Sequence, residues 1–128
     1  MIDADSLDVV CTATGRGREH DFKIYRRSKV HSLEHISIIA DKGYQGICKL
    51  HRNSHHPIKA TKKHELTICE EKYNREISRC RIPIEHVNRY IKRFRILSGR
   101  YRNRHKRFGL RVNLICGIYN FQHNKLIR

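Results

Sequence analysis

The chain has 128 residues, with 28 Lys and Arg against 12 Asp and Glu, so its formal net charge is 28 − 12 = +16. This length and a 38% share of hydrophobic residues fit one domain, residues 1–128, and exclude a collagen or a disordered tail. The longest apolar stretches, residues 9–11 and 36–40, fall far short of the roughly 20 residues that a bilayer requires. Met1 is followed by neither a basic segment nor an apolar run, so we predict no signal peptide and expect an intracellular protein.

The first forty residues carry signals for a turn, two strands and a helix. Polar residues at 3–6 predict a hairpin turn, and the β-branched segment 7–14 predicts a strand. Asp21 is a suitable N-cap for a short helix over residues 22–27. The apolar segment 37–40 predicts a second strand, which should be buried on both sides.

The middle of the chain predicts shorter elements. A short helix over residues 45–50 is followed by a polar, histidine-rich loop at 51–56 and an extended segment at 57–60. Thr67 and Glu70 then have the spacing of a capping box, which predicts a helix running toward residue 79.

Two further helices are predicted in the last fifty residues. Proline fits the first turn of a helix and breaks an interior one, so a new helix is expected to begin at Ile82 or Pro83. Its apolar stripe consists of Ile84, Val87, Ile91 and Phe94. The last helix, residues 109–122, is expected to face inward with Leu110, Leu114, Cys116 or Gly117, Ile118 and Phe121. The order of strands and helices predicts an α/β protein.

Positive charge is concentrated in the second half of the chain. Residues 1–78 hold 14 basic and 11 acidic side chains, whereas residues 79–128 hold 14 basic side chains and one acid, Glu85. Such a density of Arg, interleaved with aromatic residues, favours the binding of nucleic acid over a merely solvated surface. No lipidation motif accompanies the charge, so a membrane patch is not expected.

Two acids stand where they could carry chemistry. Asp41 follows an apolar strand, the position where open α/β sheets place ligands, although Asp-Lys-Gly is also ordinary turn chemistry. Glu85 has Arg81, Arg89 and Lys92 at helical spacing. It is therefore either a surface carboxylate in ion pairs, or a partner of Asp41 in holding Mg²⁺ against a phosphodiester. Composition alone leaves these two interpretations even.

Several motifs taken together resemble one family. They are Gly17-x-x-His20-Asp21, the run Ala40-Asp41-Lys42-Gly43-Tyr44-Gln45-Gly46, the spacing Arg81-x₃-Glu85-x₆-Lys92, the run 93–97, and Tyr101-Arg102-Asn103-Arg104. In this order they resemble the catalytic domain of bacterial insertion-sequence transposases of the DDE class. The similarity covers nearly the whole chain, although Ser78 stands where the family motif has Tyr.

The resemblance implies an RNase H-like mixed sheet with flanking helices and two Mg²⁺ (or Mn²⁺) ions that serve DNA strand cleavage and transfer. By position, Asp41 matches the second catalytic Asp and Glu85 the catalytic Glu, and both would be metal ligands. Arg81 and Lys92 match the basic partners of that Glu. The expected DNA contacts are Arg81, Lys92, Arg93, Arg95, Arg102 and Arg104. The implied partner is transposon-end DNA, bound by a homodimer in the bacterial cytoplasm, at the nucleoid.

The family's first catalytic Asp has no match in the chain. In the family it lies on the first strand of the sheet, upstream of a hairpin, whereas here the hairpin begins at once. Asp3, Asp5 and Asp8 are available acids, but each would place a catalytic residue in a turn. We therefore expect an N-terminally truncated copy that lacks its first strand, and only a weak single-metal site.

Other roles remain open for a few polar residues. His20, Asp21 and Tyr44 could form a wall of the active site, although His20 and Asp21 are equally suited to capping a helix. Cys48, His51 and His55 could bind Zn²⁺, but their spacing is not that of a standard zinc finger. A non-catalytic DNA-binding remnant and a small RNA-binding protein are the alternative functions.

Overall fold

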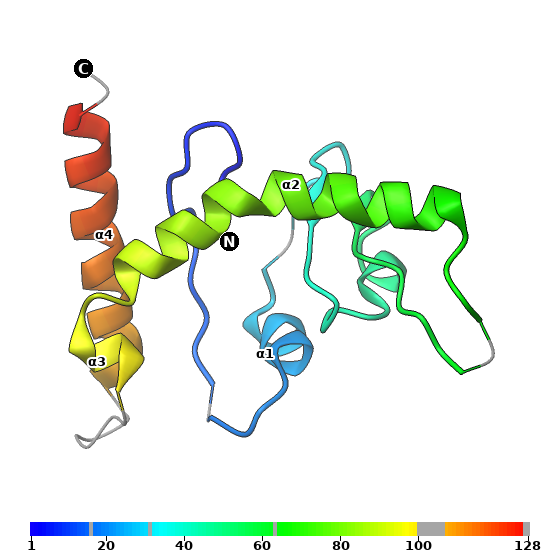
Figure 1. Ribbon diagram of the computed structural model, residues 1–128. Coiled ribbons are helices and arrows are strands. Elements are labelled where there is room, and N and C mark those ends of the chain that lie inside the picture. Colours follow the sequence, from blue (N-terminus) through cyan, green and yellow to red (C-terminus); the bar gives the residue numbers. More distant parts are fainter. Residues whose placement is uncertain (16, 31, 63, 100–106, 127–128) are drawn as a thin grey trace. The chain divides into compact units, whose positions relative to one another are not determined.

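The structure is a computed structural model that describes residues 1–15, 17–30, 32–62, 64–99 and 107–126. The chain divides into two compact units, one formed by Gly15–Arg81 and the other by Met1–Thr14 together with Ile82–Arg128. Helix α2 (Ile68–Ile91), the longest element, gives residues to both units (Figure 1). No helix in the described part of the chain is long and apolar enough to cross a membrane.

The Gly15–Arg81 unit is built around a short parallel sheet. Strand β1 (Ile38–Ile39) pairs with β2 (Ser54–His55), so that Ile38 lies opposite Ser54. The prediction of a strand at 37–40 is confirmed in a shorter form, whereas the predicted loop 51–56 contains β2, which the sequence did not indicate. Polar residues form this strand because a buried histidine of the same loop fixes it, as described below.

Two short helices pack beside this sheet. Helix α1 (Asp21–Ser28) confirms the predicted helix, but its N-cap is His20, whose side chain accepts a hydrogen bond from the Phe22 N–H. The 3-10 helix η1 (Ile47–Lys49) replaces the predicted helix 45–50. The small core of the unit consists of Ile38, Ala40 and Ile47, packed against Phe22, Tyr25 and Tyr44.

Helix α2 begins as the sequence predicts and then continues further than expected. The Glu70 carboxylate accepts the Thr67 N–H at 2.8 Å, and Thr67 Oγ1 accepts the Glu70 N–H at 3.3 Å, which confirms the capping box. The prediction of a new helix at Ile82 or Pro83 is wrong, because one helix runs through Pro83. Proline removes a single backbone donor, and the apolar residues buried on both sides of it, Ile77 and Val87, keep the helix packed.

The other unit is mainly helical. Its core consists of Val87 and Ile91 from α2 and Ile115, Cys116 and Tyr119 from α4 (Phe108–Leu126). Along the chain, α3 (Arg95–Ser98) comes between these two helices, and its N-cap is the exposed Phe94.

The last helix is present as predicted, and Cys116 is buried as expected, but other residues that were predicted to face inward are exposed. Leu110, Leu114 and Phe121, predicted to face the core, have 62–70% of their surface exposed. The helix carries apolar residues all round, so their periodicity does not select one face. Packing against Val87 and Ile91 selects the face that contains Ile115 and Tyr119.

The N-terminal segment forms a turn but not the predicted strand. Asp3 Oδ1 accepts the backbone N–H groups of Asp5 and Ser6, and this hydrogen bonding lowers the pKa of Asp3. Beyond the turn, the described residues 7–14 form only an isolated antiparallel bridge between Ile2 and Val9. Taken together, the helices and the small sheet are consistent with the predicted α/β class, and the RNase H-like sheet stays a prediction.

Candidate active site and nucleic-acid interface

Asp41 stands at the surface directly after the buried end of the β1 segment. Ala40 before it is buried, whereas the Asp41 side chain is 55% exposed. The Lys42 N–H donates to Asp41 Oδ1 at 2.6 Å, and the Tyr44 N–H donates to the Asp41 carbonyl at 2.9 Å. The turn therefore fixes this carboxylate at the end of the strand, as the sequence predicts.

Arg81 pairs with Asp41. The Arg81 guanidinium, on α2, donates to Asp41 Oδ1 at 3.0 Å, and 26% of the Arg81 side chain is exposed. The family resemblance made Arg81 a partner of Glu85 and gave no sign of this contact. A partly exposed pair contributes only about 0.2–1 kcal/mol to stability, so its main effect is to orient the two side chains.

Glu85 lies one helical turn after Arg81 on the same helix and is exposed. Asp41 and Glu85 belong to different compact units, and their predicted proximity stays a prediction.

Carboxylate oxygens are the ligands that Mg²⁺ prefers, so the chemistry of these two acids fits a divalent ion. Within the described residues, however, no group of three His, Cys, Asp or Glu side chains could hold a metal.

The three predicted wall residues gather around the Asp41 turn. Tyr44 packs edge-on against Phe22, with ring centroids 6.2 Å apart. Burial raises the pKa of Tyr44, and the nearby negative charges of Asp21 and Asp41 raise it further. The His20 ring lies close to the turn: a Cβ atom added to Gly43 would be 3.7 Å from this ring. Their placement agrees with a wall, and their role stays a prediction.

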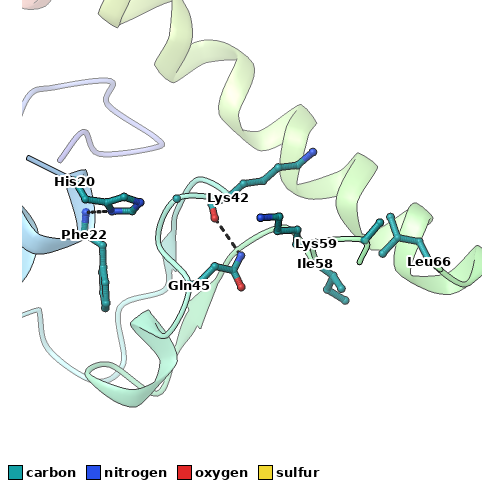
Figure 2. A pocket seen from close by; sticks show the side chains of 9 residues that line it. His20, Phe22, Lys42, Gln45, Ile58, Lys59 and Leu66 are labelled. Atoms are coloured by element: carbon teal, nitrogen blue, oxygen red, sulfur yellow. Dashed lines mark hydrogen bonds between the residues drawn. The ribbon is translucent and has the colours of Figure 1, made fainter. Parts of the chain in front are cut away.

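A cleft of about 620 Å³ opens beside this turn, within the Gly15–Arg81 unit. Figure 2 shows His20 directed from the start of α1 toward the turn, and Lys59 directed toward it from another segment. The cleft is lined by His20, Phe22, Lys42, Gly43, Gln45, Ile58, Lys59, Ala60 and Leu66. Lys59 lies outside every motif, so no pattern in the sequence indicated it, whereas Lys42 and Gln45 belong to the Asp41 motif.

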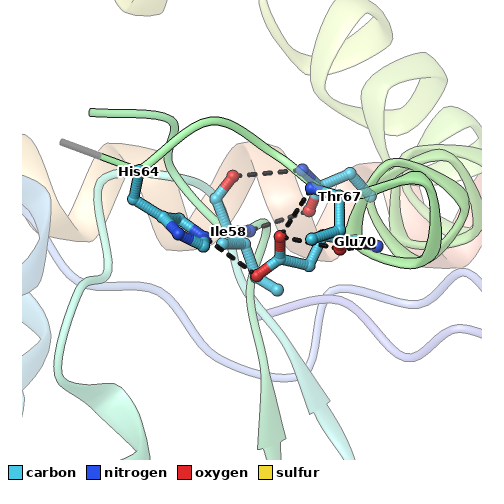
Figure 3. Close-up of polar contacts among 5 residues, drawn as sticks. Ile58, His64, Thr67 and Glu70 are labelled. Carbon is cyan, nitrogen blue, oxygen red and sulfur yellow. Dashed lines mark hydrogen bonds and ion pairs between the residues drawn. The ribbon is translucent and has the colours of Figure 1, made fainter. Parts of the chain in front are cut away.

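The segment that brings Lys59 to the cleft is held by polar contacts to α2. Asn74 accepts the Ile58 N–H at 2.8 Å and donates to the Ile58 carbonyl at 3.0 Å. Farther along, His64 contacts the Glu70 carboxylate at 3.1 Å, and the same carboxylate binds Thr67 (Figure 3). Hydrogen bonds from Thr67 lower the pKa of Glu70, so the acid stays ionised at neutral pH.

The histidine and cysteine residues that were candidates for zinc have other partners. His51 is buried, with Nδ1 at 3.0 Å from Ser54 Oγ and Nε2 at 3.1 Å from the Leu33 carbonyl. The Cys48 thiol donates to the Ser54 carbonyl at 3.2 Å. Both nitrogens of the His51 ring are thus engaged within the protein. These contacts fix the β2 segment and give His51 a structural role.

Three of the predicted DNA contacts follow α2 closely in the chain. Lys92 and Arg93 come directly after its end, Arg95 begins α3, and all three are exposed. The Arg93 guanidinium lies 5.3 Å from the centre of the Tyr90 ring. Arg102 and Arg104 lie outside the described residues. Exposed cations beside an aromatic ring are suited to phosphate and base contacts.

Comparison with known proteins identifies the family. The model of a family described as DDE superfamily endonuclease matches residues 1–120. The chain belongs to the DDE superfamily endonucleases. This DDE endonuclease chain is also 51% identical, over 122 residues, to a probable transposase for insertion sequence element IS702 from Microchaete diplosiphon. The match covers 95% of the chain but only 44% of that relative, and no solved structure matches the chain.

Proposed function

We propose that this DDE endonuclease chain acts in DNA transposition, as part of a protein that cleaves transposon ends and transfers the strands with Mg²⁺ or Mn²⁺. The observation that carries the proposal is the family match over residues 1–120, together with the 51% identity to a probable transposase. The chain spans less than half of that relative. Strand cleavage and transfer are therefore proposed for a protein that carries all the catalytic residues of the family.

Asp41 and Glu85 would supply two of the carboxylates at the reacting phosphodiester. The exposure of Asp41 at the end of a strand segment supports this role, as does its hydrogen bond to Arg81, the first residue of the Arg81-x₃-Glu85-x₆-Lys92 motif. Divalent ions, when bound, would activate the attacking oxygen and stabilise the leaving oxygen.

The remaining features belong to the same proposal. Arg81, Lys92, Arg93 and Arg95 would hold the DNA backbone, since a high density of Arg and Lys neutralises phosphates. We further propose an RNase H-like fold, assembly as a homodimer on transposon ends, and action at the nucleoid in the bacterial cytoplasm.

A non-catalytic DNA-binding role is the second candidate. It is favoured by one observation, that the described residues bring no three metal-ligating side chains together. A single ion cannot serve both the attacking and the leaving oxygen of a phosphodiester. We therefore expect the isolated chain to bind DNA and to nick it little or not at all.

A nicking assay separates the two candidates. The purified chain is incubated with supercoiled DNA and Mg²⁺ or Mn²⁺, beside the Asp41→Asn and Glu85→Gln variants, and binding to transposon-end DNA and structured RNA is measured in parallel. Binding to DNA with no nicking supports the second candidate for the isolated chain. Robust nicking that both substitutions abolish would instead show a complete site, to which Asp3, Asp5 or Asp8 contributes. Preference for structured RNA would contradict both candidates.

A further inference from the structure

The cleft beside the Asp41 turn combines basic and apolar side chains. Lys42 and Lys59 are the two basic residues that line it, and no acid is among its described lining residues. Ile58, Leu66 and Phe22 give it an apolar surface. Like charges that line one cleft repel each other unless an anion lies between them. A volume of about 620 Å³ is large enough for a ligand with both an anionic and an apolar part.

His20 adds a hydrogen-bonding ring to this cleft. Its Nδ1 accepts the Phe22 N–H at 3.3 Å as the N-cap of α1, so Nε2 is the ring nitrogen that can donate to a ligand. Gln45 is fixed in the same cleft, because its Nε2 donates to the Lys42 carbonyl at 3.1 Å. The cleft therefore presents fixed polar groups around an apolar surface, a combination that suits a ligand with a phosphate and a flat ring.

We propose that this cleft binds one nucleotide of a DNA strand, a role that rests on the function proposed above. Lys42 and Lys59 hold the phosphate, and the apolar side chains of Phe22, Ile58 and Leu66 receive the sugar and base. Lys42 directly follows Asp41, so the bound nucleotide lies next to that carboxylate within the same unit. Ile58, Lys59 and Leu66 of the cleft lie outside the family motifs and outside the basic last fifty residues.

A charge substitution tests the phosphate contact. Binding of a six-nucleotide single-stranded thymidine oligonucleotide is measured by fluorescence anisotropy as a function of salt, for the chain and for Lys59→Gln. Losing one phosphate contact on a single strand should weaken binding about fivefold at ~0.1 M salt and reduce the salt slope by about 0.7. Lys62→Gln is the matched control, because Lys62 is exposed in the same segment but does not line the cleft, and it should leave binding unchanged.

A second measurement tests the apolar surface directly. Methyl resonances of Ile58 and Leu66 should shift when the oligonucleotide is added, whereas those of Leu50, exposed in the same unit but outside the cleft, should not. An abasic oligonucleotide of the same length should shift them much less. If the chain binds the oligonucleotide while Lys59→Gln matches Lys62→Gln and these methyls stay still, the inference is overturned and the proposed function stands. If the chain binds no DNA at all, both fail.

Discussion

Two asparagine side chains replace missing strand neighbours in this protein. Asn74 bonds both the N–H and the C=O of Ile58, and Asn120 does the same for Val9, with distances of 2.8 to 3.0 Å. An amide side chain offers one donor and one acceptor, as a neighbouring peptide would. Each asparagine thus fixes an irregular segment that lacks regular pairing, one in each compact unit.

Asn74→Ala should lower the free energy of unfolding by about 1–3 kcal/mol, because the half-buried N–H and C=O of Ile58 lose their partner. Asn74→Asp keeps the acceptor but not the donor, so its stability should lie between that of the unsubstituted chain and that of Asn74→Ala. Chemical denaturation gives the values, with Asn88→Ala, exposed on the same helix, as a control near zero. Equal stability of Asn74→Ala and Asn88→Ala would contradict this role.

Helix α2 determines where the Arg81 and Glu85 motif lies, because it carries both residues in one continuous helix. Pro83 lies between them and leaves the Arg79 carbonyl without its usual helical donor. A break at this point would remove the helical spacing on which the motif depends. The continuity of the helix is therefore a structural condition of the proposed site.

Pro83→Ala should stabilise the chain by about 2 kcal/mol. Proline is about 3 kcal/mol less favourable than alanine inside a helix, and the greater freedom of the unfolded alanine chain offsets up to about 1 kcal/mol of the gain. The measurement is again chemical denaturation, followed by helical circular dichroism. Cys80→Ala, at an exposed position of the same helix, should change stability by less than about 0.5 kcal/mol. No gain for Pro83→Ala would indicate that the helix ends at the proline in solution.

For the chain taken as a whole, we expect the charge distribution to govern the proposed encounter with DNA. The formal charge is +16, and residues 79–128 contribute 14 − 1 = +13 of it. Counterion release makes such binding depend steeply on salt, with a slope of about 0.9 for each phosphate contacted on a duplex. The basic half should therefore dominate duplex affinity, with the cleft contributing a local contact to a single strand.

Charge reversal to Glu at Arg93, Arg95, Arg102 and Arg104 should reduce the salt slope of duplex binding by up to about 3.6, as four contacts are lost. The matched control reverses four exposed residues of the other unit, Arg18, Arg26, Lys49 and Arg52, and gives the same net charge, 16 − 8 = +8. Anisotropy titrations between ~50 and ~200 mM salt measure both slopes. If the two variants behave alike, net charge alone accounts for binding.

Features that depend on neighbouring residues could be predicted from the amino-acid sequence. The strand before Asp41, the turn after it, the Thr67–Glu70 capping box and the unequal charge of the two halves all follow from short-range chemistry or composition. The family is likewise contained in the ordered motifs and is confirmed by the match over residues 1–120.

Contacts between residues that are distant in the sequence could not be predicted and follow from the packing of the folded chain. Pairing of Ser54 and His55 with β1, the contact between Arg81 and Asp41, and the approach of Lys59 to the Asp41 turn each join segments with no shared local pattern. The buried face of α4 is likewise selected by packing, because α4 carries apolar residues on all its faces. Several pairings of segments can satisfy the local sequence preferences equally well, and the packing of the whole unit selects one of them. A local sequence pattern therefore cannot predict which pairing forms.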